Sequence, residues 1–327
     1  RIPPNYWRKK RKSWLVREQI GLAAEKLPVL GRPEDIVGRV LPEYVQKLNL
    51  NSETKIILGA SDGYLSTIGV GVLDEKSFAL NVGTSGAVRV IAPEAVVDSE
   101  NRFFCYPVDK KHYLLGGPVN NGGIVFEWAR KTIFDPDQTA EDFINVAETV
   151  PAGSNGLIFH PYLGGERAPI WNAQARGSFI GLTRNHTKPQ MARSVLEGIV
   201  FNLLGAARGV REKIGEPDAL RVTGGFVKSN FVRQLIADIF NLPVIVIKND
   251  QSGTLAAMFL AQVGMKKEAN LEKIAKKIDE SKVYFPNPKN VAVYQDIIPI
   301  YREVEHDLDQ SYEKIASFQE KYPKLFE

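Results

Sequence analysis

The sequence predicts an α/β fold in which helices flank a mixed β-sheet. Between residues 78 and 116, apolar runs of strand length follow one another across turn-rich segments, and a helical pattern begins only near Gly122. From about residue 156 onward, strand-like and helix-like segments alternate along the chain. Successive strands followed by alternating strands and helices are typical of an α/β layered domain with a mixed sheet.

Each element is predicted from its hydrophobic period and from the turn residues at its ends. The helix-like stretch 63–72 contains Gly69 and Gly71, which allow close packing or a bend. The last helix is rich in charged residues and is expected to pack across the outside. In chain order the predicted elements are a helix at 42–49, a strand at 55–60, a helix at 63–72, strands at 78–82, 87–92, 102–108 and 112–116, helices at 122–133 and 140–149, a strand at 156–160, a helix at 190–214, a strand at 219–223, a helix at 230–240, a strand at 243–247, and helices at 253–264 and 291–321.

The length of 327 residues is enough for roughly two domains of ordinary size. We expect a boundary near Leu73, with residues 1–72 as the remnant of a first domain and 73–327 as a second domain. Residue 1 is Arg rather than Met, and the segment up to about Leu50 lacks the strands that would complete a core. We therefore expect the chain to be the later part of a larger protein, or one whose early residues are missing.

The composition is that of a soluble globular protein, with 44% hydrophobic and 24% charged residues. The net charge of +4 gives no reason to expect nucleic acid, and the basic run at 8–12 is interpreted as a solvated helix face. A single cysteine, Cys105, excludes an internal disulfide framework and fits a reducing cytoplasm. We find no apolar run long enough for a membrane and no signal peptide.

Asp62 is the first candidate for chemistry. It directly follows a strand that looks buried and precedes a glycine, so its carboxylate is expected to project from a strand end into a cleft, where a catalytic base would lie. The alternative is an Asp that caps the helix beginning at Gly63. Taken alone, Asp62 fits the capping role better. Together with the glycine-rich turns that follow, it favours the base.

Three glycine-rich segments offer backbone N–H groups to an anion or a nucleotide. Gly83-Thr84-Ser85-Gly86 is either a phosphate cradle or a plain hairpin turn, and it is not a Walker A loop. Asn120-Asn121-Gly122-Gly123 opens a helix, where it either receives an anion or allows tight packing. Thr223-Gly224-Gly225 closes a strand. It either faces adenine or ribose, helped by Ser229 and Asn230, or forms a tight turn with Asn230 as N-cap.

A polar loop at 164–177 contains the adjacent charges Glu166 and Arg167. They either touch a substrate or form an internal ion pair, which is the commoner fate of such neighbours. The four histidines share no metal-ligand spacing, so no histidine-held metal is predicted.

These segments, in this order, resemble the FGGY carbohydrate kinases of the sugar kinase–Hsp70–actin superfold. Within that family, the motif sequences are most similar to those of gluconate kinases. The resemblance runs from about Leu27 to the C-terminus. It is carried by Gly59-Ala-Ser-Asp-Gly, Val82-Gly-Thr-Ser-Gly-Ala, Phe104-Cys-Tyr, Gly116-Gly-Pro-Val-Asn-Asn-Gly-Gly-Ile-Val, Phe159-His-Pro-Tyr-Leu-Gly-Gly-Glu-Arg-Ala-Pro and Ile297-Ile-Pro-Ile.

The resemblance implies an actin-like ATPase (ribonuclease H-like) fold and an ATP- and Mg²⁺-dependent kinase. It implies that residues 1–72 are the end of a sugar-binding domain and 73–327 a nucleotide-binding domain. It assigns Asp62 as the base that deprotonates the sugar hydroxyl. Nucleotide contacts are assigned to Gly83, Thr84, Gly123, Gly224, Gly225 and Ser229, and no residue is assigned to the metal.

The sequence departs from the family pattern in two places. It has no Asp-x-Gly-Thr-Thr-like phosphate and magnesium loop, and Gln251 and Ala256 stand where many relatives have Glu and Gly. A protein of these 327 residues alone is therefore expected to be inactive or nearly so.

The expected reaction of the intact protein is phosphorylation of D-gluconate to 6-phosphogluconate in the cytoplasm, without nucleic acid or membrane partners. Whether it forms a homo-oligomer stays open. The alternatives are another acceptor such as xylulose, glycerol or ribulose, or a non-catalytic nucleotide-binding or scaffold module of the actin-like superfold.

Overall fold

The computed structural model describes residues 21, 23, 26, 29, 31–108, 112–134, 137–248, 251–267, 270–275 and 278–322. The basic run at 8–12 lies outside the described residues. The described strands are β1 (Ile36–Arg39), β2 (Lys55–Ile57), β3 (Ser77–Val82), β4 (Gly86–Ala92), β5 (Phe104–Pro107), β6 (Tyr113–Val119), β7 (Ile158–His160), β8 (Ser178–Ile180), β9 (Ala219–Thr223), β10 (Val244–Ile247) and β11 (Glu280–Tyr284). The helices are α2 (Pro42–Lys47), α3 (Asp62–Gly69), α4 (Gly123–Ile133), α5 (Ala140–Glu148), α6 (Lys188–Ile214), α7 (Asn230–Phe240), α8 (Ser252–Gly264), α9 (Leu271–Ala275) and α10 (Pro288–Lys321), with 3₁₀ turns η2 (Ser154–Gly156) and η3 (Gly225–Lys228).

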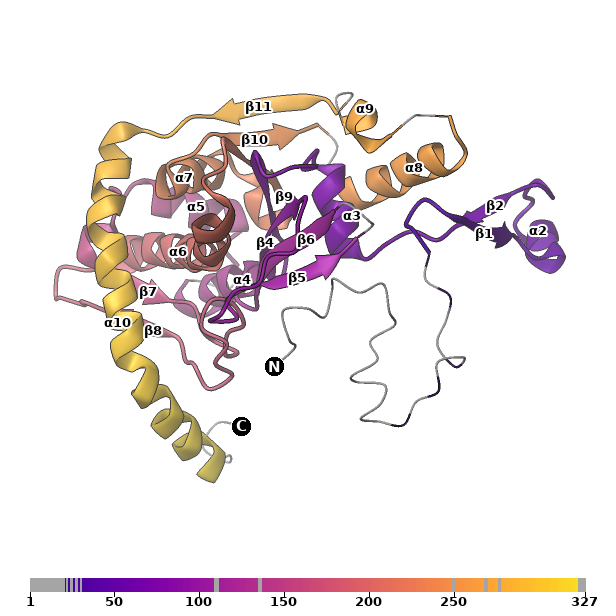
Figure 1. Cartoon of the computed structure of the whole chain (residues 1–327). Helices are drawn as coiled ribbons and strands as arrows, with labels where there is room; N and C mark the ends of the chain where they lie inside the picture. Colours follow the sequence, from indigo (N-terminus) through magenta and orange to yellow (C-terminus); the bar gives the residue numbers. More distant parts are fainter. Residues whose placement is uncertain are drawn as a thin grey trace.

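A seven-stranded mixed sheet forms the centre of the described chain, in the order β11-β10-β9-β3-β4-β6-β5. Strands β10, β9 and β3 are parallel neighbours, whereas β4, β6, β5 and β11 pair antiparallel. Helices lie around this sheet (Figure 1). The mixed sheet flanked by helices is as predicted. The sequence pattern missed β1, β8, β11 and α9, which are short or carry few buried side chains.

The two faces of the sheet are covered by different helices because side chains alternate along each strand. Val88 and Val90 of β4 belong to the large core that includes residues of α4, α5, α6 and α7. Ile91 belongs to a smaller core made with Tyr64 of α3 and Leu260 of α8. Residues 87, 89 and 91 of β4 therefore face α3 and α8, and this face carries the cleft described below.

Helix α3 packs against α8 with almost no space between the backbones. A Cβ atom at Gly69 would lie 1.9 Å from the carbonyl oxygen of Ser252, so only glycine fits at this position. Gly71, two residues later, has a φ of +89°, which turns the chain toward β3. Both glycines therefore act as the sequence predicted, one in close packing and the other in a bend.

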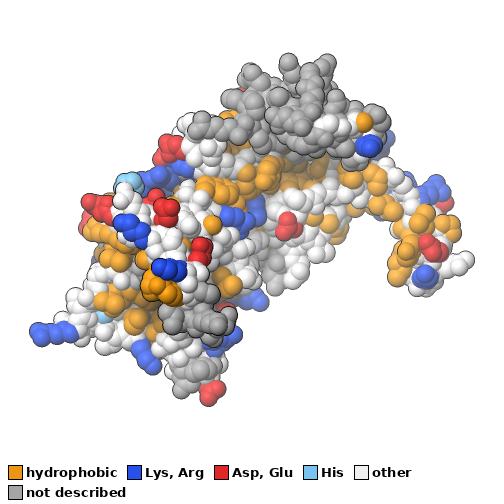
Figure 2. Space-filling model, turned by 90° about the horizontal axis from the view of Figure 1, so that it is seen from below, with side chains coloured by type: hydrophobic (Ala, Val, Ile, Leu, Met, Phe, Trp, Pro, Cys, Tyr) orange, Lys and Arg blue, Asp and Glu red, His pale blue; other side chains and the backbone are white. Residues whose placement is uncertain are grey.

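The segment before α3 departs from the sequence prediction. Residues 55–60 were expected to form a buried strand, but β2 ends at Ile57, is mostly exposed, and pairs only with the exposed β1. This β1–α2–β2 unit projects from the body (Figure 1). Figure 2 shows hydrophobic side chains in orange on the surface of this projecting unit. Its exposed large hydrophobic residues are Ile36, Val37, Leu41, Tyr44, Leu48 and Ile56.

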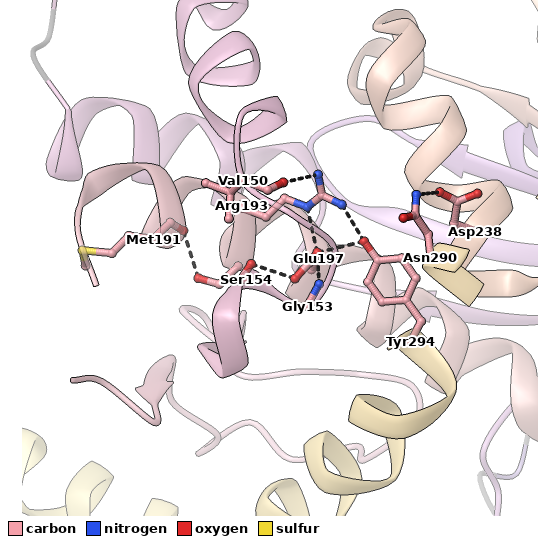
Figure 3. Close-up of polar contacts among 10 residues, drawn as sticks. Val150, Gly153, Ser154, Met191, Arg193, Glu197, Asp238, Asn290 and Tyr294 are labelled. Atoms are coloured by element: carbon pink, nitrogen blue, oxygen red, sulfur yellow. Dashed lines mark hydrogen bonds and ion pairs between the residues drawn. The ribbon is translucent and has the colours of Figure 1, made fainter. Parts of the chain in front are cut away.

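The long charged helix α10 runs along one side of the molecule, as expected (Figure 1). Polar contacts fasten it to the body. The Asn290 side chain donates to the Asp238 carboxylate of α7 at 2.7 Å. Deeper inside, Tyr294 donates to the Glu197 carboxylate of α6 at 2.8 Å, and Arg193 donates to the Tyr294 hydroxyl at 2.7 Å. Figure 3 shows these side chains pointing toward one another. None of the described helices is long and apolar enough to cross a membrane.

Stability below neutral pH is expected to depend on His160. Its ring is fully buried and donates from Nε2 to the Tyr301 carbonyl at 3.1 Å, while Ser178 lies 3.2 Å from Nδ1. Burial lowers the pKa of His160 from 6.5 to about 4. The folded protein therefore holds this ring neutral at a pH where the unfolded chain binds a proton, and acid favours unfolding.

Between pH 6.5 and pH 4, the wild-type protein should lose roughly 3 kcal/mol of unfolding free energy through this residue. His160→Gln should lack this slope in urea unfolding, whereas His306→Gln on the exposed side of α10 should retain it. Equal slopes in His160→Gln and the wild type would show that another group is responsible.

Candidate active site

Asp62 is the first residue of α3, and β2 already ends at Ile57, so the predicted position directly after a strand is wrong. The predicted alternative, in which Asp62 is the N-cap, is also wrong. Ser61 is the N-cap, and its hydroxyl accepts from the Tyr64 N–H at 3.4 Å. Asp62 is exposed, and its Oδ1 accepts from the Gly63 N–H at 2.7 Å. A carboxylate in the first turn is favoured by the helix dipole.

Asp62 lies at an open cleft of about 860 Å³. The cleft is also lined by Ser85, Gly86 and Ala87 of the β3–β4 turn and the start of β4, by Thr223 and Gly224 at the end of β9, and by the first turn of α8. Segments that are far apart in the sequence thus meet at one place. The sequence predicts that the acid and all three glycine-rich turns meet. Residues of the turns at 83–86 and 223–225 line this cleft, whereas those at 120–123 do not.

The sheet explains why two of the glycine turns meet. Strands β3 and β9 are parallel neighbours with Asn81 opposite Thr223, so their carboxyl ends lie side by side at the same edge. A Cβ atom at Gly224 would lie 2.3 Å from the Val82 carbonyl oxygen, and φ of Gly224 is +110°. Glycine is therefore required at 224 by close approach as well as by conformation.

The β3–β4 turn contains two consecutive free N–H groups. Thr84 and Ser85 are exposed, and within the described part of the chain their N–H groups donate no hydrogen bond. Consecutive free N–H groups are able to bind an anion. Among the turn residues, Ser85 and Gly86 line the cleft, whereas Gly83 and Thr84 do not.

The glycine pair that opens α4 has a packing role. The Gly123 N–H donates to the Gly83 carbonyl at 2.8 Å, and the Ile124 N–H donates to the Thr84 carbonyl at 3.0 Å. A Cβ atom at Gly123 would lie 2.7 Å from the Gly83 carbonyl oxygen. The first N–H groups of α4 are thus occupied by the β3–β4 turn, which agrees with tight packing, the alternative that the sequence left open.

Ser229 and Asn230 have structural partners. The Ser229 hydroxyl accepts from the Phe231 N–H at 3.2 Å and is the N-cap of α7, so the alternative that placed Asn230 at the cap is wrong. Asn230 accepts a hydrogen bond from the Tyr284 hydroxyl instead. Gly225 begins η3 and has open space around it. Gly225 and Ser229 lie near Gly224 in the chain but do not line the cleft.

The buried carboxylate of Glu166 accepts several hydrogen bonds but does not pair with the Arg167 guanidinium. It is 2% exposed, and its carboxylate accepts from Asn121 Nδ2 at 2.9 Å, Asn202 Nδ2 at 2.6 Å and the Arg167 N–H at 2.7 Å. The side chains of Glu166 and Arg167 have other partners and form no ion pair with each other, so of the two alternatives the internal ion pair is wrong. Arg167 donates from Nη2 to the Val119 carbonyl at 2.9 Å and lines the cleft.

Arg89 lines the same cleft and was missed by the sequence analysis. The available signal was a single charged residue in the otherwise apolar strand Gly86–Ala92. Burial lowers the pKa of Arg89, nearby Asp62 opposes this shift, and Arg167 adds to it. Two guanidinium groups and one carboxylate therefore share this part of the cleft.

The described residues fit a nucleotide better than a protein-bound metal. Free N–H groups at Thr84 and Ser85 and bare backbone at Gly224 suit phosphate and nucleoside. Within the described ranges, no three His, Cys, Asp or Glu side chains converge as a metal site. Mg²⁺ typically binds through one or two carboxylates together with substrate phosphates and water, so Asp62 is the cleft carboxylate available to it.

Comparison with known proteins identifies relatives over most of the chain. Residues 78–265 match the model of the FGGY family of carbohydrate kinases, C-terminal domain. A gluconokinase from Bacillus subtilis (strain 168) is 35% identical over 309 residues, which cover 91% of this chain and 60% of that protein. The chain thus spans about 60% of the length of this curated relative.

Solved structures give the same picture. The crystal structure of a gluconate kinase from Lactobacillus acidophilus has a TM-score of 0.90 and 55% identity, covering 92% of this chain and 61% of that one. A ligand-bound xylulose kinase from Lactobacillus acidophilus has a TM-score of 0.89 and 55% identity over the same shares. The fold is therefore the actin-like ATPase (ribonuclease H-like) fold that the sequence led us to expect. With its motifs, its fold and 188 matched residues (78–265) in agreement, the chain belongs to the FGGY family of carbohydrate kinases.

Proposed function

We propose that the complete gene product transfers the γ-phosphoryl group of ATP to the terminal hydroxyl of D-gluconate and forms 6-phosphogluconate. One observation carries the proposal. The exposed carboxylate of Asp62 shares a cleft with the β3–β4 turn, whose Thr84 and Ser85 N–H groups are free, and with the bare backbone of Gly224. A base, an anion cradle and a nucleotide surface are the parts that this reaction needs.

Asp62 acts as the general base. Its Oδ1 is held by the Gly63 N–H, which fixes the carboxylate and leaves Oδ2 to accept the proton of the acceptor hydroxyl. The free N–H groups of the β3–β4 turn stabilise the negative charge on the phosphate oxygens. Mg²⁺ supplies further charge neutralisation on the β- and γ-phosphates when bound.

Gly83, Thr84 and Gly123 shape this cradle. Gly123 does so from behind, because its N–H is bonded to Gly83. Gly224 lines the nucleoside side of the cleft, with Gly225 and Ser229 following it at the end of β9. In this proposal residues 1–72 end a sugar-binding domain, 73–327 form the nucleotide-binding domain, and the enzyme works in the cytoplasm.

Gluconate is proposed over xylulose because a curated gluconokinase is 35% identical to this chain, compared with 33% for a curated xylulose kinase. Xylulose is the second candidate, because a xylulose kinase shows the same 55% identity. An acceptor panel decides between them. With the complete gene product, ADP release coupled to NADH oxidation should be fastest with D-gluconate, and the product should be 6-phosphogluconate by mass spectrometry.

Preference for D-xylulose in this panel would mean that xylulose is the acceptor, and the proposed kinase activity would be retained. ATP binding without phosphoryl transfer to any acceptor would instead favour a non-catalytic nucleotide-binding module.

A further inference from the structure

Arg89 is anchored in the sheet but has no partner for its charge. Among the described residues its guanidinium makes no hydrogen bond and no ion pair, although it is more than half buried. Charged groups withdrawn from water are normally paired, because losing hydration is costly. Asp62 is near enough to affect Arg89 electrostatically, yet the two side chains form no ion pair. The missing partner is therefore expected on a ligand.

Two glycines leave room for this side chain. A Cβ atom at Gly116 would lie 3.0 Å from Arg89 Cγ, so glycine on the neighbouring strand β6 makes space for the aliphatic stem. A Cβ atom at Gly63 would lie 3.1 Å from Arg89 Nε and 3.2 Å from Cζ, so glycine in α3 makes space for the guanidinium. The arginine is thus held between β6 and the start of α3, beside Asp62.

The position of Arg89 along β4 separates it from the phosphate cradle. Ser85, Ala87 and Arg89 line the cleft in that order. Measured between Cα atoms at about 3.3 Å per residue, the four steps from Ser85 to Arg89 span roughly 13 Å, and the Arg89 side chain extends from there to Gly63. An extended six-carbon chain has five bonds of about 1.5 Å each and spans roughly 6 Å after allowing for its zigzag. A six-carbon acceptor and a phosphoryl group can therefore lie end to end over this strand.

We propose that Arg89 binds the carboxylate of a sugar-acid acceptor and thereby selects acids over neutral sugars. The inference rests on the proposed kinase function and adds the residue that sets the acceptor class. The acid lies over Ala87, with its terminal hydroxyl at Asp62 toward the cradle and its carboxylate at Arg89. A guanidinium matches a carboxylate through two parallel hydrogen bonds. Arg167 adds positive charge to the same wall.

The test compares D-gluconate with D-gluconamide, which replaces the carboxylate by a neutral amide of nearly the same shape. In the complete gene product, kcat/KM for gluconate should exceed that for gluconamide about 100-fold. Arg89→Gln should lower kcat/KM for gluconate about 100-fold, mainly through KM. It should leave gluconamide turnover and the KM for ATP nearly unchanged. Arg89→Lys should recover part of the preference because it restores the charge but not the bidentate geometry.

Two controls make the result specific. Arg184→Gln removes an equally charged, exposed side chain outside the cleft and should behave as the wild type. Retained gluconamide turnover in Arg89→Gln shows that this variant is folded. Isothermal titration calorimetry of gluconate without ATP should show the same loss of affinity in Arg89→Gln, independently of turnover.

Three outcomes would overturn the inference. Equal loss on gluconate and gluconamide would place Arg89 at the phosphoryl group. Equal kcat/KM values of the wild type for gluconate and gluconamide would reject the proposed carboxylate site but leave the proposed kinase activity unaffected. Unchanged gluconate affinity of Arg89→Gln in calorimetry would reject the contact between Arg89 and the carboxylate. This test does not depend on turnover. A complete gene product that phosphorylated no acceptor would instead contradict the proposed function.

Discussion

Replacing Asp62 with Asn is expected to lower kcat for D-gluconate by about 10³-fold, because general-base catalysis typically contributes 10²–10⁴-fold. The substitution removes the proton acceptor and little else. Asn Oδ1 can still accept from the Gly63 N–H, and the helix remains capped by Ser61. ATP affinity should therefore be unchanged in equilibrium binding, while steady-state kinetics show the loss in kcat.

Asp307→Asn is the matched control, since Asp307 is an exposed carboxylate on α10. It removes the same charge from the protein and should retain wild-type kinetics. A kcat in Asp62→Asn within a few-fold of the wild type would reject Asp62 as the base. A large rise in the Kd for ATP would instead place its carboxylate at the nucleotide or its metal.

Truncating Glu197 to Ala is expected to lower the free energy of unfolding by about 3–5 kcal/mol, the usual cost of leaving a buried charge unpaired. Glu197 is 1% exposed and lies 2.7 Å from Arg193, which is also buried. Its carboxylate accepts from the Ser154 hydroxyl at 2.8 Å and the Gly153 N–H at 3.0 Å as well. It therefore ties α6 to the loop before β7 and to Tyr294 of α10 (Figure 3). Chemical denaturation gives the value.

The exposed ion pair Arg39–Glu53 provides the comparison. It has the same N–O distance of 2.7 Å, but its side chains are 60% and 64% exposed. Glu53→Ala should therefore change stability by less than about 1 kcal/mol. In a double-mutant cycle, the variant with both Arg193→Met and Glu197→Met should lose less free energy of unfolding than the sum of the losses in the two single variants. The reason is that the double variant contains no unpaired buried charge. Additive effects would show that the two charges do not depend on each other.

The central sheet and the helices were predictable because their signals are local. Apolar runs of strand length and helical periods lie in contiguous stretches, as in the residues of β3, β4, α6 and α7. The short strand β1 and the edge strand β11 escaped because their side chains are mostly exposed and carry no apolar alternation. Strand β2 was expected to be buried because residues 56–58 form an apolar run, but Ile56 and Leu58 are exposed.

The candidate site was predictable where sequence order decides position. Parallel pairing of β3 with β9 brings Gly83 and Gly224 to the same edge, and the glycines themselves mark that edge. The role of Arg89 was not predictable, because the space made for it by Gly63 and Gly116 comes from two other segments of the chain. Glu166 and Arg167 were misjudged because buried amides at 121 and 202, distant in sequence, compete for the carboxylate.

The contact between Gly69 and Ser252 joins two elements that line the cleft. Because a Cβ atom at position 69 would lie 1.9 Å from the Ser252 carbonyl oxygen, the backbones of α3 and α8 touch directly. Tyr64 and Ile68 hold the same helix to Ile91 of β4. The acid at the start of α3 and the free amides of the β3–β4 turn therefore belong to one packed unit. In the proposed reaction, the acceptor is brought to that unit.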